Sequence, residues 1–161
     1  MMTHPLVLQL RFTRSEWLRG LEAVQPDEAL QRFGPMNCMS WMVGHLARQE
    51  QAYWLTVPQG IVLVPEIQNL ELTPPLPEMW AAWHTITAAA DTYLDTLTPD
   101  MLLEHHIWQG QPLPESTATR LLRKIYHYWY HLGESQAVRQ LLGHTDLPSF
   151  VGNMAQGTYQ P

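Results

Sequence analysis

The sequence contains a single cysteine, Cys38, among 161 residues. One thiol excludes an internal disulfide framework and any zinc site built from several cysteines. Charged residues are also scarce, at 15% of the chain, whereas hydrophobic residues make up 45%, which is typical of a folded protein rather than a disordered one. This length is enough for one domain with a buried core, so we expect a single domain over residues 1–161.

Basic residues are few. Lysine and arginine total 9 against 15 acidic residues, which gives a formal net charge of -6. A protein that grips a phosphate backbone needs a basic face, and the one short basic cluster here, Arg120 with Arg123 and Lys124, is interpreted as the solvated side of a helix. We therefore expect no nucleic-acid partner.

Long hydrophobic runs are missing as well. No apolar run approaches the roughly 18 residues that a membrane-spanning helix needs. The first residues, Met1 to Arg11, lack a charged start followed by a small-residue cleavage site, so they do not read as a signal peptide. The expectation is a cytoplasmic protein without a membrane partner.

Apolar residues recur at helical spacing in four segments, which cover about residues 5–24, 37–55, 78–97 and 116–142. Asn37 is a candidate N-cap of the second segment and Ser116 of the fourth. The fourth segment is expected to continue through Gly133 and to stop at Gly143, a residue that favours helix C-termini. These segments predict an all-α protein with a four-helix bundle fold.

The connections between the segments are predicted from proline and glycine. Six of these residues fall in the stretch 56–77, which we interpret as a long irregular crossover between the second and third helices. Within it, Ile61–Val64 is expected to form a short strand or an apolar flap. A second irregular stretch contains His105 and His106, and the tail 144–161 is expected to be irregular.

Two histidines in the fourth segment, His127 and His131, are four residues apart. On a helix this spacing places both imidazoles on one face, so that they can share a metal ion. Eight histidines in a chain of this length give about 0.4 such pairs by chance, so a pair of core histidines is the alternative reading. His45, on the second helix, is the candidate third ligand, because metal sites in bundles are built from inward side chains on facing helices.

Several neighbours of these histidines are candidate site residues. Gln49 lies four residues after His45, and Glu134 lies three residues after His131, where it could accept a ring N–H or act as a base. An exposed glutamate is the alternative for Glu134, and polar packing is the alternative for Gln49. The candidates to line the cavity with Gln49 are Trp41, Tyr126 and Trp129.

Three segments carry a resemblance to a known family. The runs Ser40-Trp-Met-Val-Gly-His-Leu-Ala-Arg-Gln-Glu50 and Ile125-Tyr-His-Tyr-Trp-Tyr-His-Leu-Gly-Glu134, and the segment from Ala137 to Gly152, are similar to the DinB/YfiT-like superfamily of bacterial four-helix-bundle proteins. In that family one histidine of the second helix and two of the fourth form a metal site. By this resemblance His45, His127 and His131 are its ligands here.

The resemblance further implies a divalent metal, nickel or zinc most often and iron in some relatives. Characterised relatives act on low-molecular-weight thiols such as bacillithiol, mycothiol and glutathione, and many form dimers, so a small-molecule substrate and a homodimer are expected. Three neutral imidazoles leave a coordination position open, as catalytic zinc does, and a thiol or water bound there loses its proton more easily. A thiol S-transferase, a related hydrolase, a non-catalytic metal- or ligand-binding stress-response protein and a metal-free helical dimer all remain open from the sequence.

Overall fold

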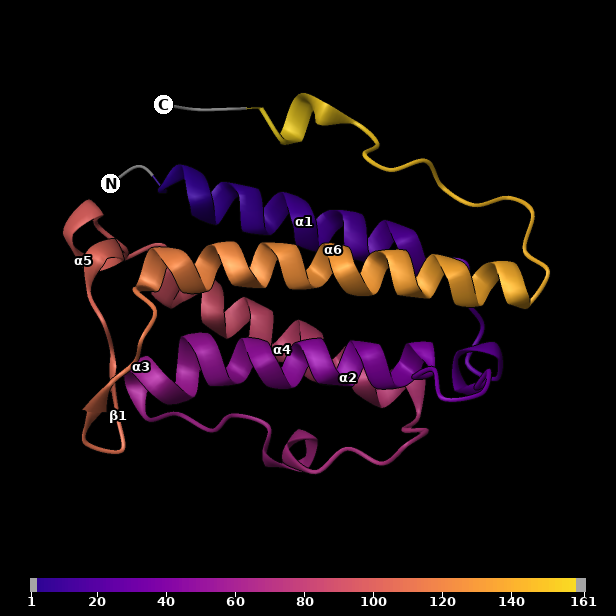
Figure 1. Cartoon of the computed structure of the whole chain (residues 1–161), viewed down its shortest axis with the longest axis horizontal. Coiled ribbons are helices and arrows are strands. Elements are labelled where there is room, and N and C mark those ends of the chain that lie inside the picture. Colours follow the sequence, from indigo (N-terminus) through magenta and orange to yellow (C-terminus); the bar gives the residue numbers. More distant parts are fainter. Residues whose placement is uncertain (1–2, 159–161) are drawn as a thin grey trace.

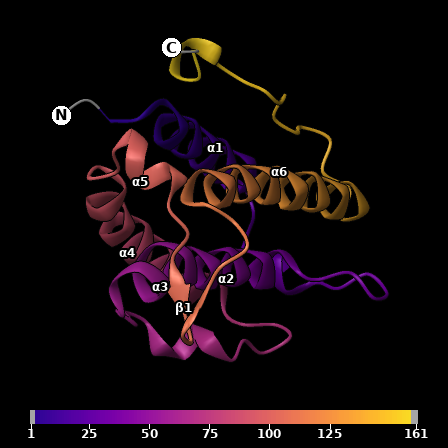
Figure 2. The ribbon, with the colours of Figure 1, turned by 60° about the vertical axis from the view of Figure 1, so that its left-hand side comes forward.

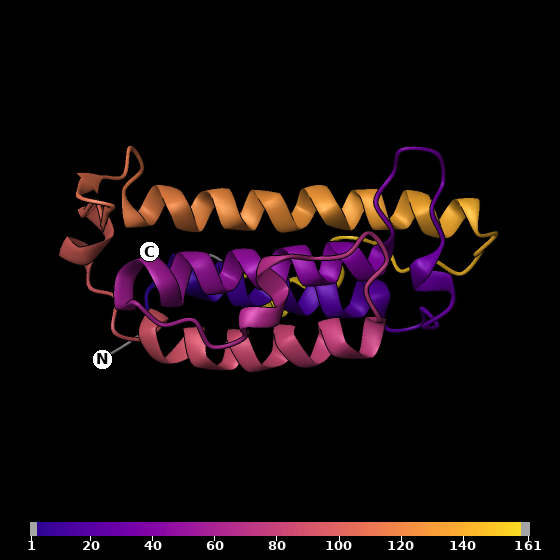
Figure 3. The same ribbon diagram turned by 90° about the horizontal axis from the view of Figure 1, so that it is seen from below.

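Four long helices lie along a common direction in the computed structural model of the chain, which describes residues 3–158 (Figure 1). They are α1 (Pro5–Leu21), α2 (Met39–Glu50), α4 (Leu76–Leu94) and α6 (Thr117–Leu141). Helix α1 packs against α6 and α2 packs against α4, which gives two layers (Figures 1 and 2). Seen from below, α2 lies between α4 and α6 (Figure 3). The predicted all-α, four-helix bundle is confirmed.

Helix α6 begins and ends as its sequence predicts. The Ser116 side chain accepts a hydrogen bond from the backbone N–H of Thr119 at 3.3 Å, which satisfies a free donor of the first turn. The helix runs through Gly133 to Leu141 without a break. Gly143 then adopts a φ of 87°, a left-handed conformation that a residue without a Cβ adopts at no steric cost.

The N-cap of α2 is Cys38, so the prediction of Asn37 is wrong by one residue. The carbonyl of Cys38 accepts the first helical hydrogen bond, from Met42 N–H at 3.1 Å, and its Sγ accepts from Trp41 N–H at 3.4 Å. The thiol also donates to the carbonyl of Leu72 at 3.4 Å. The buried thiol therefore anchors the start of α2 to the crossover.

Helical backbone continues beyond α2, first as a π-helix over Gln51–Thr56 and then as α3 over Val57–Gln59. The crossover therefore begins at Gly60, whose φ is 70°, and not at the predicted residue 56. Pro58 has no backbone N–H, so backbone carbonyls of the preceding turn lose their helical donor. Side-chain donors replace it, and the helix continues past Pro58. Tyr53 and Trp54 accept from Arg120 Nη2 at 3.2 Å and Gln59 Nε2 at 2.7 Å.

The crossover from Gly60 to Pro75 holds one short 3-10 turn, Pro65–Gln68. The segment Ile61–Val64 forms neither a strand nor a buried flap, because the Gln51 side chain occupies its backbone groups. Gln51 Oε1 accepts from the N–H groups of Leu63 and Val64 at 2.8 and 2.7 Å. The side chains of Ile61, Val62 and Leu63 stay largely exposed.

The stretch between α4 and α6, expected to be irregular, contains a short helix and a two-stranded hairpin. Thr98 caps the short helix α5 (Pro99–Leu103) by accepting from Met101 N–H at 3.3 Å. Strands β1 (Ile107–Trp108) and β2 (Gln111–Pro112) then pair antiparallel in a two-stranded hairpin. His105 is exposed, whereas His106 is half-buried beside Tyr93 and Thr117.

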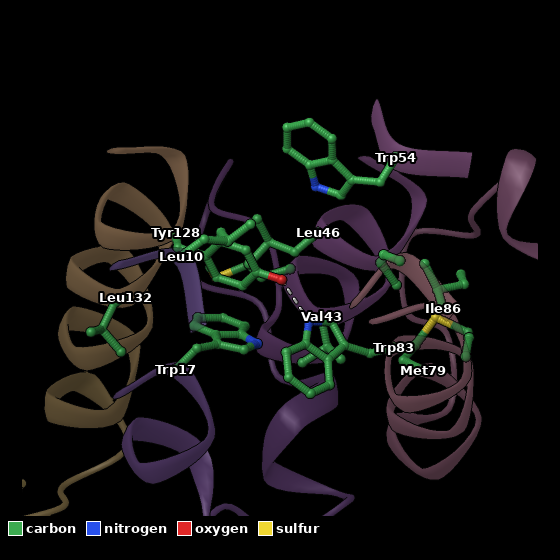
Figure 4. Close-up of a cluster of buried hydrophobic side chains, with 14 of the residues drawn as sticks. Leu10, Trp17, Val43, Leu46, Trp54, Met79, Trp83, Ile86, Tyr128 and Leu132 are labelled. Carbon is green, nitrogen blue, oxygen red and sulfur yellow. Dashed lines mark hydrogen bonds between the residues drawn. The ribbon is translucent and has the colours of Figure 1, made fainter. Parts of the chain in front are cut away.

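The core fills the space between the two layers (Figure 4). Trp17 of α1 packs edge-on against Tyr128 of α6, with ring centroids 6.2 Å apart. The Trp83 indole N–H donates to the Tyr128 hydroxyl at 2.8 Å, so the polar tip of a buried tyrosine is satisfied (Figure 4). Large side chains of all four long helices thus fix how the layers face each other.

Beyond α6 the chain turns back and passes along α1 without regular structure except for the 3-10 turn Met154–Gln156 (Figure 1). Arg19 donates to the carbonyl of Ser149 at 2.6 Å, and Glu16 accepts from Gly152 N–H at 2.9 Å. The last residues of the predicted tail, 159–161, lie outside the described residues. No helix within residues 3–158 is long and apolar enough to cross a membrane.

Candidate metal centre

Helices α2 and α6 bring His45, His127 and His131 together. Each residue offers one ring nitrogen, and the three nitrogens lie within 4.8 Å of one another. The Nε2 atom of His127 lies 3.4 Å from that of His45 and 2.9 Å from that of His131. His131 is buried, while His45 and His127 are half-buried.

These separations suit a shared cation. Two nitrogens bound to zinc at 2.0–2.1 Å in tetrahedral geometry lie about 3.3 Å apart, and the observed values of 2.9 and 3.4 Å lie on either side. Burial is the main cause that lowers the pKa of His45 to about 3 and those of His127 and His131 to about 4. All three rings are therefore neutral at pH 7, which is the state that binds metal.

Two side chains orient the imidazoles of α6. Gln49 Oε1 lies 2.9 Å from His127 Nδ1, and Glu134 Oε2 lies 2.8 Å from His131 Nδ1. Both oxygens accept, so each Nδ1 carries the proton and each Nε2 presents its lone pair to the shared centre. Burial raises the pKa of Glu134. Gln49 and Glu134, both singled out from the sequence, thus contact the predicted ligands.

His45 has a different environment. Arg48 Nη2 lies 3.3 Å from its Nδ1 and Gln49 Nε2 lies 3.2 Å from its Nε2, and both of these neighbouring groups can only donate. A neutral ring carries one proton, so His45 accepts from only one of these two donors. A cation held through Nε2 would require the ring proton on Nδ1, and Arg48 would then have to turn away. The indole of Trp41 stacks on His45 with centroids 4.6 Å apart and an interplanar angle of 10°.

The other two cavity candidates lie differently. Tyr126 is 64% exposed and lines a pocket that also contains Thr119 and Arg123, so the structure does not bring it to the histidines. Trp129 is half-buried and packs against the hydrophobic core. Adjacent positions on a helix diverge by about 100°, so the neighbours of a ligand in sequence point elsewhere.

The basic cluster is the largest correction to the sequence interpretation. Arg120 is 3% exposed and Lys124 is 1% exposed, so only Arg123 lies on the solvated side of the helix. Arg120, Lys124, His127 and His131 follow one another at spacings of four, three and four, which is the inward stripe of a bundle helix. This spacing could have predicted that Arg120 and Lys124 are buried. Their charge instead favoured a position on the surface.

Lys124 lies one turn from the histidines. Its Nζ donates to Gln49 Oε1 at 3.3 Å, the same oxygen that accepts from His127. The nearby buried carboxylate, Glu50, is already bound by Arg14, with contacts of 3.1 and 2.5 Å. Burial therefore dominates and lowers the pKa of Lys124 to about 7. Gln49 links this ammonium group to the histidine cluster.

Comparison with known proteins identifies a matching family and a similar fold. The family model described as the DinB superfamily matches residues 9–135. A solved structure titled as the conserved protein of locus from Enterococcus faecalis is similar with a TM-score of 0.64 and 16% identity, over 89% of this chain and 100% of that one. This likeness concerns the fold. No curated protein matches the sequence.

Proposed function

This chain belongs to the DinB superfamily, and from that premise we propose that it is a metal-dependent enzyme that activates a small thiol, a thiol S-transferase. One observation carries the proposal: one ring nitrogen from each of three neutral histidines of α2 and α6 lies within 4.8 Å of the other two. The family's metal-binding character and the histidine cluster support a divalent cation there, with nickel or zinc as the first candidates and iron as a third.

The residues present fit a cation. His45, His127 and His131 would hold it, and the ligand set contains no carboxylate, so the site would keep the full charge of the ion. When bound, a divalent cation supplies a Lewis-acid centre that lowers the pKa of a coordinated thiol or water. The three imidazoles leave room for such a ligand, as catalytic rather than structural sites do.

The protein's own groups prepare this chemistry. Gln49 and Glu134 hold the two rings of α6 in one tautomer and orientation, which favours ligation through Nε2. Glu134 is also the candidate base, because its raised pKa brings it closer to neutral pH. Trp41 covers one face of His45 and shields that side from water.

The first test is elemental analysis of untagged protein purified without nickel. We expect about one equivalent of divalent metal in the wild type and none in the His127→Ala/His131→Ala double variant. His84→Ala is the matched control, since His84 lies on α4 outside the cluster and its loss leaves the metal in place. A metal-free wild type that added zinc or nickel does not stabilise would leave three core histidines and refute the proposal.

The second test is turnover. Metal-loaded wild type is mixed with glutathione or cysteine and the electrophile 1-chloro-2,4-dinitrobenzene, and thioether formation is followed by absorbance. Acceleration that disappears in the double variant supports the transferase. Bound metal without turnover of any thiol, or with hydrolysis alone, would instead identify a non-catalytic metal-binding protein or a hydrolase. The homodimer proposed from the family resemblance is tested separately by sedimentation.

A further inference from the structure

Two buried basic residues of α6, Arg120 and Lys124, have no part in the proposed metal chemistry. They are four residues apart, so their side chains lie on one face of the helix, one turn from each other. Both contact the ring of Tyr53, with Arg120 Cζ 4.6 Å and Lys124 Nζ 5.0 Å from its centroid. Two groups that are normally positive therefore share one aromatic neighbour in the interior, shielded from solvent.

The interior carboxylates nearby are bound to another group. Glu50 is fully buried and accepts from Arg14 Nε and Nη2 at 3.1 and 2.5 Å. Asp91 accepts from the remaining nitrogen of the same arginine, Nη1, at 2.7 Å. No carboxylate among the described residues forms a salt bridge with Arg120 or Lys124. Charges in a protein interior are normally paired, and these two have no anion as a partner.

The guanidinium of Arg120 also has an unused donor. Its Nη2 donates to the carbonyl of Tyr53 at 3.2 Å, whereas Nη1 is shielded from solvent and has no acceptor in the part of the chain that the structure describes. Burial lowers the pKa of Arg120. Burial acts on Arg14 as well, but there the Glu50 carboxylate outweighs it and the pKa is raised. An acceptor for Nη1 of Arg120 would have to arise inside the protein, because solvent does not reach this nitrogen.

Lys124 carries a nucleophile in the same place. Among the described residues its Nζ makes one hydrogen bond, to Gln49 Oε1 at 3.3 Å. Burial lowers the pKa of Lys124 to about 7, so near neutral pH a large share of the molecules carries the unprotonated amine with its lone pair. An unprotonated amine is the form that reacts with carbon dioxide. Carbon dioxide is small and uncharged, so the local openings of a folded protein admit it to an apolar interior.

We propose that Lys124 is a carbamate site, at which its amine adds reversibly to carbon dioxide and the product pairs with Arg120. The Nζ lone pair forms a bond to the carbon of carbon dioxide, and one C=O electron pair moves onto an oxygen. The nitrogen then releases one proton to water. The product carries one negative charge, and the step needs no oxidant, reductant or further reactant.

The surroundings of the amine favour the product over the free amine. Opposite charges four residues apart on a helix attract each other, so the carbamate and Arg120 form an ion pair in place of two like groups. The carbamate oxygens supply an acceptor for the shielded Nη1, and its nitrogen keeps one N–H for Gln49 Oε1. The inference does not rest on the proposed thiol function, because the reaction involves neither metal nor thiol.

The test treats metal-free protein with ¹³C-labelled bicarbonate at pH 8, which supplies labelled carbon dioxide, and records a ¹³C spectrum. Lys124 is the only lysine, so a carbamate resonance that is present in the wild type and missing from Lys124→Met is its adduct. Any adduct of the α-amino group stays in the variant. We expect the signal to fall roughly 10-fold or more when the same chain is unfolded in guanidinium chloride, because an unfolded lysine is almost entirely protonated at pH 8.

Two arginine variants test the pairing. Arg120→Gln should lower the carbamate occupancy about 10-fold, since the charged partner is lost. Arg123→Gln is the matched control, because Arg123 is exposed and bound to Glu115, and it should keep the wild-type occupancy. Equal occupancy in all three proteins overturns the pairing with Arg120.

A second measurement needs the wild type alone. Triethyloxonium ion esterifies a carbamate, and peptide mass spectrometry then locates the trapped carboxyl group. We expect it on the peptide that contains Lys124. A wild type treated with bicarbonate that carries no trapped carboxyl group on this peptide refutes the carbamate site, whether or not any variant folds.

Discussion

The buried ammonium group of Lys124 gives a quantitative prediction. Lys124 is the only lysine in the sequence, it is 1% exposed, and the pKa of its amine is lowered from 10.5 to about 7 by burial. Between pH 7 and 10 the folded protein has therefore released a proton that the unfolded chain still holds. The unfolded state binds more protons over this range, so the free energy of unfolding rises with pH.

The size of the effect follows from the two pKa values. One proton of difference corresponds to a slope of about 1.4 kcal/mol per pH unit. From pH 7.5 to 9.5 the contribution of Lys124 amounts to roughly 2–3 kcal/mol of added stability. Below pH 7 both states hold the proton and the dependence ends.

Two assays check this. Lysine labelled with ¹³C at Cε gives a single lysine resonance, because the chain has one lysine, and its titration midpoint should lie near 7. Urea unfolding of metal-free wild type and Lys124→Met at pH 7.5, 8.5 and 9.5 should show a rise in the wild type that exceeds the rise in the variant. Parallel pH profiles of wild type and Lys124→Met, or a titration midpoint of the lysine resonance near 10.5, would refute the reasoning. Either result would mean that burial does not lower the pKa of Lys124.

Two substitutions next to the histidines should change metal affinity in opposite directions. Gln49→Leu removes the acceptor of the His127 ring N–H at 2.9 Å, so the affinity for zinc should fall about 10- to 100-fold. The affinity is measured by competition with a chelator. An unchanged affinity would mean that Gln49 does not orient the ring of His127. Arg48→Gln removes the obligate donor at His45 Nδ1 and a nearby positive charge, so zinc should bind several-fold more tightly, by about 1 kcal/mol. Weaker binding would show that Arg48 does not oppose ligation by His45.

The helices and the termini of α6 are predictable from the sequence because they depend on local chemistry. Helical periodicity, the hydroxyl of Ser116 and the backbone freedom of Gly143 act within one or two turns. The continuation of α2 past residue 55 is different. It depends on Gln59 and on Arg120, which lies 67 residues from the Tyr53 carbonyl that it binds. Such a partner has no local signature.

The histidine cluster and the buried cations were predictable to different degrees. His127 and His131 are four residues apart on one helix, so their proximity follows from helical geometry, whereas the approach of His45 requires the packing of α2 against α6. Residue type alone places an arginine or lysine on the surface. Arg120 and Lys124 contradict that rule because their position on the inward stripe outweighs their charge.

The burial of these two cations is itself a reason to connect them with function. Charged groups placed in a core generally reduce stability relative to apolar side chains of similar volume. Here both lie on the inward stripe of α6 that also carries His127 and His131, and no carboxylate among the described residues forms a salt bridge with either. If they served only the fold, Lys124→Met would be neutral or stabilising and would leave thiol binding unchanged. If they serve the site, the same variant should unfold at a higher urea concentration near pH 7 and bind glutathione more weakly.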